Sequence, residues 1–197
     1  MPSASDPASL LRALAQALHT HGCRWYLFGA QAVTLWGRPR LTTDVDVTVE
    51  IASDGSAALV AALSAAGFRL SEAFSDEFVR STRVLPLIHI DSTMPLDVVL
   101  AGPGLEEQFL DRVVAVQVGD FTVPVISPED LVVTKVLAGR EKDVGDIRGI
   151  LHARADSLDV DYIRRTLRVI EEALGQSDLM PLFEAEWARA VGRRQPE

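Results

Sequence analysis

The sequence predicts an α/β (α+β) protein with a helical region at its C-terminal end. The chain has 197 residues, of which 48% are hydrophobic and 24% charged, an ordinary balance for a globular protein with its own core. Short apolar runs alternate with helical patterns up to about residue 126, and every later pattern is helical. We therefore expect an α/β core over residues 1–126 and a C-terminal helical region over residues 127–197.

Five elements are predicted in the first third of the chain. Asp6 and Pro7 are typical of the N-cap and first position of a helix. Gly29 and Ala30 turn a short apolar strand into a short helix. In chain order we expect a helix ending at Gly22, a strand over 24–28, a helix up to Trp36-Gly37, a strand over 43–50 and a helix over 56–66.

The remaining elements follow from turn and capping residues. Apolar runs joined by a turn predict strands over 84–90 and 96–100, and a second pair of strands flanks Gly119-Asp120. A helix is expected between these pairs, over 104–112. Ser127 and Pro128 predict the start of the helical region. Within that region we expect the helices to be punctuated at Gly139, Gly149, Gly175 and Pro181.

Composition limits the classes of function. No apolar run approaches the roughly 20 residues of a membrane-spanning helix, and the N-terminus lacks the pattern of a secretion signal. The single cysteine, Cys23, excludes an intramolecular disulfide and fits a reducing compartment. The net charge of −9 disfavours tight, nonspecific binding to nucleic acid. We expect a cytoplasmic protein with no membrane partner.

The most informative residues are two carboxylates one residue apart, Asp44 and Asp46, in the stretch T-T-D-V-D-V-T-V. Alternate residues of a strand point to the same face, so both aspartates would project together while the valines between them feed a core. Two adjacent like charges repel each other unless a cation lies between them. Carboxylate oxygens are ligands that suit Mg²⁺, so the pair predicts a metal site.

Asp97 is the best candidate for a third carboxylate. It lies in M-P-L-D-V-V-L, where its apolar neighbours would face the opposite side of a strand. Asp91 is a rival, but the residues around it favour a turn. If the Asp97 strand lies beside the Asp44 strand, three carboxylates could hold two Mg²⁺ ions for phosphoryl transfer. Asp97 could also accept the proton of an acceptor hydroxyl.

Gly29 would supply the phosphate-binding part of the site. A glycine between a strand and a helix lets backbone N–H groups approach phosphates closely. Arg38 and Arg40, just before the Asp44 strand, could contact phosphates or the acceptor.

Together these residues resemble the nucleotidyltransferase superfamily that includes DNA polymerase beta. The match is F-G-A-Q-A-V-T-L-W-G-R-P-R-L-T-T-D-V-D-V-T-V, followed by L-D-V. The resemblance implies a mixed sheet flanked by helices, with Asp44 and Asp46 as metal ligands and Asp97 as third ligand or base. It also implies that Gly29 and Ala30 form the phosphate turn. Ala30 departs from the usual Gly or Ser and lacks a hydroxyl for a phosphate contact.

A closer resemblance is to bacterial AbiEii-type toxin-like nucleotidyltransferases, through G-R-P-R-L-T-T-D-V-D and the later stretch K-V-L-A-G-R-E-K-D-V-G-D-I. It implies that Lys135 or Lys142 neutralises nucleotide phosphates. It also implies that Asp143 or Asp146 orients the lysine or contacts the acceptor. The lysines would share a helix face only if Gly139 does not break the helix.

The resulting expectation is a Mg²⁺-dependent enzyme that moves a nucleoside monophosphate from an NTP to an acceptor hydroxyl and releases pyrophosphate. The acceptor could be a tRNA end, a protein or a small molecule, and an antitoxin is an expected partner if the protein acts as a toxin. Two alternatives stay open. One is a small-molecule transferase of the aminoglycoside-modifying kind, and the other is an inactive nucleotide-binding module.

Overall fold

The computed structural model describes residues 7–52, 55–72 and 75–192. These residues belong to two compact units. The first consists of Met1–Gln31 and Leu41–Ile126, and the second consists of Ala32–Arg40 and Ser127–Glu197. Helix α2 (Gly29–Trp36) begins in the first unit and continues into the second.

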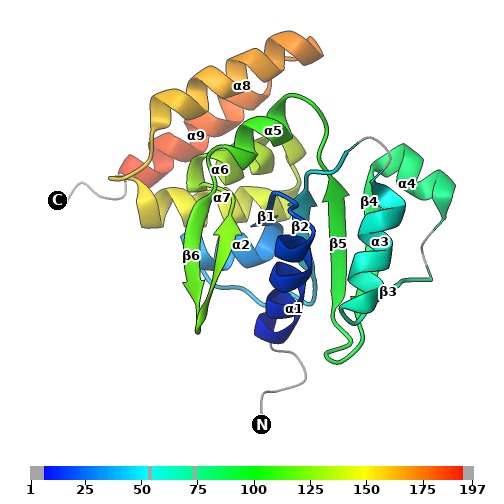
Figure 1. Ribbon diagram of the computed structural model, residues 1–197. Helices are drawn as coiled ribbons and strands as arrows, with labels where there is room; N and C mark the ends of the chain where they lie inside the picture. Colours follow the sequence, from blue (N-terminus) through cyan, green and yellow to red (C-terminus); the bar gives the residue numbers. More distant parts are fainter. Residues whose placement is uncertain (1–6, 53–54, 73–74, 193–197) are drawn as a thin grey trace. The chain divides into compact units, whose positions relative to one another are not determined.

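A mixed seven-stranded sheet forms the centre of the first unit within the described residues (Figure 1). The strand order is β3-β4-β5-β2-β1-β7-β6. Strand β2 pairs in parallel with β5, β1 pairs in parallel with β7, and the other neighbours are antiparallel. The strands are β1 (Trp25–Phe28), β2 (Val45–Val49), β3 (Phe68–Leu70), β4 (Val84–His89), β5 (Pro95–Leu100), β6 (Val114–Val118) and β7 (Phe121–Val125).

Strands β2 and β5 show why the centre of the sheet is stable. Val45, Val47 and Val49 of β2 are fully buried, and so are their neighbours Leu96 and Val98 of β5. They alternate with Asp46 and Thr48 in β2 and with Asp97 and Val99 in β5, so one face of the strand pair is entirely apolar. Burial of such side chains stabilises the fold by about 1.5–3 kcal/mol each. The opposite face is left for residues with other roles.

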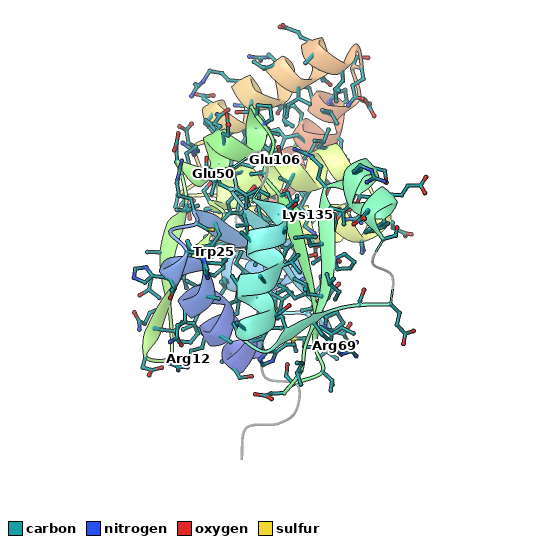
Figure 2. The ribbon with its side chains drawn as sticks, turned by 45° about the vertical axis from the view of Figure 1, so that its right-hand side comes forward. Arg12, Trp25, Glu50, Arg69, Glu106 and Lys135 are labelled. Atoms are coloured by element: carbon teal, nitrogen blue, oxygen red, sulfur yellow. The ribbon has the colours of Figure 1, made fainter. Side chains whose placement is uncertain are left out.

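Within the described residues, four helices lie wholly in the first unit. Helices α1 (Pro7–Thr20) and α3 (Ser56–Ala65) contact each other and lie side by side in Figure 2. Helix α1 contributes a stripe of buried leucines, Leu10, Leu11, Leu14 and Leu18, with the spacing of an amphipathic helix. The short helices α4 (Asp76–Thr82) and α5 (Leu105–Leu110) complete the set.

The second unit is helical, with α6 (Pro128–Ala138), α7 (Glu141–Arg154), α8 (Val160–Leu174) and α9 (Leu179–Gly192). Helix α6 begins at its N-cap Ser127, whose Oγ accepts a hydrogen bond from the backbone N–H of Asp130 at 3.1 Å. It ends at Gly139, which has a left-handed φ of 60°. The end of α2 packs on α7, where the guanidinium of Arg154 lies 5.1 Å from the ring centre of Trp36.

The predicted α/β fold with a helical C-terminal region is confirmed, and every predicted strand and helix is present with small shifts of its ends. The strand predicted over residues 43–50 is one such case. Strand β2 starts at Val45, so Asp46 lies in the strand and Asp44 immediately precedes it. Gly139 does separate two helices, so Lys135 and Lys142 lie on different ones. Asp6, the predicted N-cap, lies outside the described residues.

Two short elements were not predicted from the sequence, and two predicted breaks are wrong. Strand β3 has three residues and helix α4 has no buried residue, so neither shows a hydrophobic period. Gly149 lies inside α7, and Pro181 lies in the first turn of α9, where proline is tolerated. No described helix is long and apolar enough to cross a membrane.

Two glycines of α7 give a matched test of packing in the second unit. A Cβ added at Gly145 would meet nothing within 4 Å, whereas one at Gly149 would lie 3.3 Å from the backbone N of Arg38. We expect Gly145→Ala to raise the free energy of unfolding by about 0.5–1 kcal/mol, because alanine is the better helix former. Gly149→Ala should gain less or lose stability, since residue 38 must move.

The midpoints of urea unfolding of the two variants and wild type measure this difference. A lower midpoint for Gly145→Ala than for Gly149→Ala would contradict the packing described for α7.

Candidate functional site in the sheet unit

Parallel pairing of β2 with β5 places two of the predicted carboxylates side by side. Asp46 and Asp97 are direct register partners, and neighbouring strands lie about 4.8 Å apart. Both side chains leave the face opposite the buried valines, and both are partly exposed. Asp44, two residues before Asp46, is also partly exposed, and the hydroxyl of Thr42 donates a hydrogen bond to its Oδ1 at 2.5 Å.

The electrostatics of this face reflect the crowding of negative charge. Burial raises the pKa of Asp97, and the nearby charge of Asp44 raises it further. Carboxylates are hard oxygen donors, so the residues present suit a divalent cation of the Mg²⁺ type. The side chains do not converge on one point: no group of three or more His, Cys, Asp or Glu residues in the described ranges has the geometry of a metal site. The register fixes the neighbouring positions of Asp46 and Asp97, and the metal site stays a prediction.

Gly29 lies in close contact with the carboxylate of Asp46. It connects β1 to α2 with a left-handed φ of 64°, and Phe28 before it is the register partner of Asp46. A Cβ on Gly29 would lie only 2.0 Å from Oδ2 of Asp46. The position therefore requires glycine twice, for its backbone conformation and for the space that Asp46 occupies. Ala30 follows as a buried residue in the first turn of α2.

A second group of predicted residues meets inside the helical unit. Lys135 of α6, labelled in Figure 2, is buried, and its Nζ lies 3.0 Å from Asp143 and 2.9 Å from Asp146 of α7. Arg40 donates hydrogen bonds to both oxygens of Asp146, at 2.9 and 3.3 Å. Burial raises the pKa of Asp143, but hydrogen bonds from Arg140 and Lys135 outweigh it and leave the pKa lowered. The ion pairs show that Lys135, Asp143 and Asp146 form one buried network, to which the exposed Arg40 is joined.

Arg38 and Lys142 do not join this network. Both are exposed, and together with Arg40, Gly145 and Asp146 they line a cavity of about 350 Å³ in the helical unit. The predicted site residues therefore form two groups, one in each unit. Asp44, Asp46, Asp97 and Gly29 gather on the sheet, while the lysines, Arg38, Arg40 and the two later aspartates belong to the helical unit.

Two residues that contact the predicted site residues were not predicted from the sequence. Thr42 supports Asp44 through a hydrogen bond, and Arg140 contacts Asp143 at 2.5 Å. The spacing of Arg140 and Asp143, three residues apart at a helix start, was a readable signal for an ion pair. Asp91, the rival third carboxylate, is exposed in the turn between β4 and β5.

The fold is that of nucleotidyltransferases, as comparison with solved structures shows. The antibiotic-resistance factor ANT(2″)-Ia superposes with a TM-score of 0.57 and 15% identity, over 85% of this chain and 94% of that one. A nucleotidyltransferase-like protein from Paracoccidioides brasiliensis gives 0.54 and 16%, over 90% and 92%. The lincosamide antibiotic adenylyltransferase LnuA, in a lincomycin-bound structure, gives 0.50 and 14%, over 74% and 96%.

The sequence places the chain in a family. Residues 9–179 match the family described as nucleotidyltransferase of unknown function (DUF6036), and the chain belongs to it. No curated protein matches the chain. The predicted superfamily and enzyme class, a nucleotidyltransferase, are therefore confirmed, whereas the closer resemblance to AbiEii-type toxins stays a prediction.

The contact between Gly29 and Asp46 can be tested with a matched glycine. Gly22 in the same unit has a φ of 66°, and a Cβ there would meet nothing within 4 Å. Both Gly29→Ala and Gly22→Ala should therefore cost about 1–2 kcal/mol in backbone strain. Only Gly29→Ala should also displace Asp46, so we expect a larger fall in melting temperature and loss of nucleotidyl transfer. Equal losses of stability and full activity in both variants would contradict the close approach.

Asp97 should show a trade-off between stability and activity. Its folded-state pKa is raised, so the ionised carboxylate costs stability at neutral pH, and the cost fades as pH falls through that pKa. In EDTA at pH 7, Asp97→Asn should therefore melt at a higher temperature than wild type while losing transfer activity. The gain should shrink as pH falls through the raised pKa of wild-type Asp97, because the carboxyl group becomes protonated there. A lower melting temperature for Asp97→Asn at pH 7 would contradict this account.

Proposed function

We propose that this protein transfers a nucleoside monophosphate from an NTP to an acceptor hydroxyl, with Mg²⁺ held by Asp44, Asp46 and Asp97. The observation that carries the proposal is the register of β2 and β5, which makes Asp46 and Asp97 neighbours on one sheet face. Membership of a nucleotidyltransferase family supports the reaction class. Two Mg²⁺ ions, when bound, would neutralise phosphate charge and align the NTP for in-line displacement.

The roles of the remaining residues follow from their positions. The backbone at Gly29 and Ala30, at the start of α2, would bind the triphosphate. The acceptor oxygen would form a bond to the α-phosphorus while the bond to the β-phosphate oxygen breaks, and pyrophosphate would leave. The proton of the acceptor hydroxyl would pass to a carboxylate oxygen of Asp97, and the burial that raises the pKa of this group favours such a role.

For the acceptor we propose several chemical classes and not one compound. ANT(2″)-Ia is known in complex with adenylyl-2″-tobramycin, and LnuA with lincomycin, which supports a small-molecule hydroxyl for this chain as well. The motif shared with AbiEii-type toxins supports an RNA end or a protein, with an antitoxin as partner. The same experiment separates these classes of acceptor.

The test follows label from each α-³²P-labelled NTP, with Mg²⁺, into total RNA, protein or a panel of aminoglycosides and lincosamides. Wild type should label one class of acceptor. The isosteric double variant Asp44→Asn/Asp46→Asn should be slower by about 100-fold or more, because charge stabilisation at the phosphates is lost. Asp91→Asn is the matched control, since this exposed aspartate lies in a turn, and it should retain wild-type transfer.

Label from a γ-³²P-labelled NTP should not be transferred, because pyrophosphate leaves with that phosphate. Absence of transfer from every NTP, together with equal Mg²⁺–NTP binding by wild type and the double variant, would refute the proposal.

A further inference from the structure

We propose that the helical unit carries a second binding site, a pocket on α7 and α9 that takes a compact phosphate-bearing molecule. The cavity has a volume of about 470 Å³, and its lining includes Arg38, Gly145, Arg148, Gly149, Glu186 and Arg189. All of these residues belong to the second unit. The proposal therefore does not depend on the carboxylates of the sheet or on nucleotidyl transfer.

The cavity has the size and continuity of a ligand site. Small-molecule pockets typically enclose about 300–1,000 Å³. Arg38, Gly145 and Gly149 also line the cavity of about 350 Å³ described above, so the two hollows adjoin along one side of α7. This arrangement can hold a ligand with more than one anionic group.

Two guanidiniums are fixed at the cavity by a buried carboxylate. Glu186 of α9 is only 2% exposed, and it accepts hydrogen bonds from Arg148 at 2.5 and 3.0 Å. Arg189 also donates to Glu186. These bonds, chiefly those from Arg148, lower the pKa of Glu186 and keep it ionised. One buried anion thus holds two cations, each about half exposed, and both retain N–H donors for another anion.

The lining as a whole has an excess of positive charge. Around the two cavities stand five basic side chains, Arg38, Arg40, Lys142, Arg148 and Arg189, against the acidic pair Asp146 and Glu186. Asp146 is already paired with Lys135 and Arg40. Arg38 and Lys142 form no ion pair or side-chain hydrogen bond with any residue of the described ranges. In a chain with a net charge of −9, this local excess of cations is complementary to an anionic ligand.

Gly145 adds an independent reason to expect a ligand. A glycine inside a helix weakens that helix, and close packing is the usual compensation, as at Gly149 beside Arg38. No protein atom would meet a Cβ on Gly145 within 4 Å. The missing side chain instead leaves both cavities open, because Gly145 lines each of them. Arginine forks match phosphate geometry best, which favours a phosphate-bearing ligand of small-molecule size.

Isothermal titration calorimetry with inorganic tripolyphosphate as probe, in EDTA, tests the pocket without divalent cations. Wild type should bind the probe, and Arg38→Ala should weaken binding by about tenfold, the effect of one charge-assisted hydrogen bond. Gly145→Leu should greatly weaken binding without removing a charge, because the leucine side chain would occupy space where the two cavities meet at Gly145. Circular dichroism checks that each variant is folded.

Two controls separate this site from its alternatives. Arg165→Ala removes an exposed cation of α8 that lines neither cavity, and it should bind the probe like wild type. Asp44→Asn/Asp46→Asn should also bind normally, even though it is designed to lose nucleotidyl transfer. Failure of the proposed transfer with normal probe binding would leave the pocket standing.

Three results of these titrations would overturn the proposal. They are absence of tripolyphosphate binding to wild type, unchanged binding by Gly145→Leu, and an equal loss in Arg38→Ala and Arg165→Ala, which indicates diffuse attraction. Citrate and a single-stranded RNA oligonucleotide serve as competing ligands. Preference for either over tripolyphosphate would reject a compact phosphate-bearing ligand.

Discussion

The parallel pairing of β2 with β5 is the constraint on which the proposed chemistry depends. It sets Asp46 beside Asp97, and the alternation of the strand makes this unavoidable once the valines and leucines are buried on the other face. Burial and, next, the nearby charge of Asp44 raise the pKa of Asp97, so its ionised form costs free energy. Gly29 adds a second constraint, because the side chain of Asp46 occupies the space that a Cβ at residue 29 would need. A costly arrangement of this kind is typical of functional sites.

In the helical unit, the buried charged side chains form ion pairs with one another. Lys135, Asp143 and Asp146 satisfy one another in a buried network that Arg40 and Arg140 extend. Removing one partner of such a network leaves an uncompensated buried charge, which costs about 3–5 kcal/mol. Any phosphate contact by Lys135 must therefore compete with two carboxylates. The exposed cations Arg38 and Lys142 carry no such cost, which makes this part of the unit the natural place for an external anion.

Much of the fold and part of the site could be predicted from local patterns. The T-T-D-V-D-V-T-V and L-D-V stretches identify β2 and β5 because alternation is a local property, and Ser127 and Gly139 mark the ends of α6 through capping chemistry. Other features are not local. The pairing of Lys135 with both Asp143 and Asp146 depends on how α6 packs on α7, and the Arg148–Glu186 pair joins residues 38 positions apart. The helix break predicted at Gly149 is wrong, because this glycine allows the backbone at Arg38 to approach α7 closely. That contact cannot be inferred from the sequence.

The most direct test of the central claim is the binding of Mn²⁺, a spectroscopic substitute for Mg²⁺, measured by electron paramagnetic resonance with a nonhydrolysable NTP analogue present. If Asp44, Asp46 and Asp97 hold the metal, wild type should bind Mn²⁺ tightly and show the coupled signal of neighbouring ions. Asp46→Asn and Asp97→Asn should each weaken binding by about tenfold or more, since one charged ligand is lost, while Asp91→Asn should not. Equal Mn²⁺ binding by all four proteins would contradict the proposal that the sheet carboxylates form the metal site.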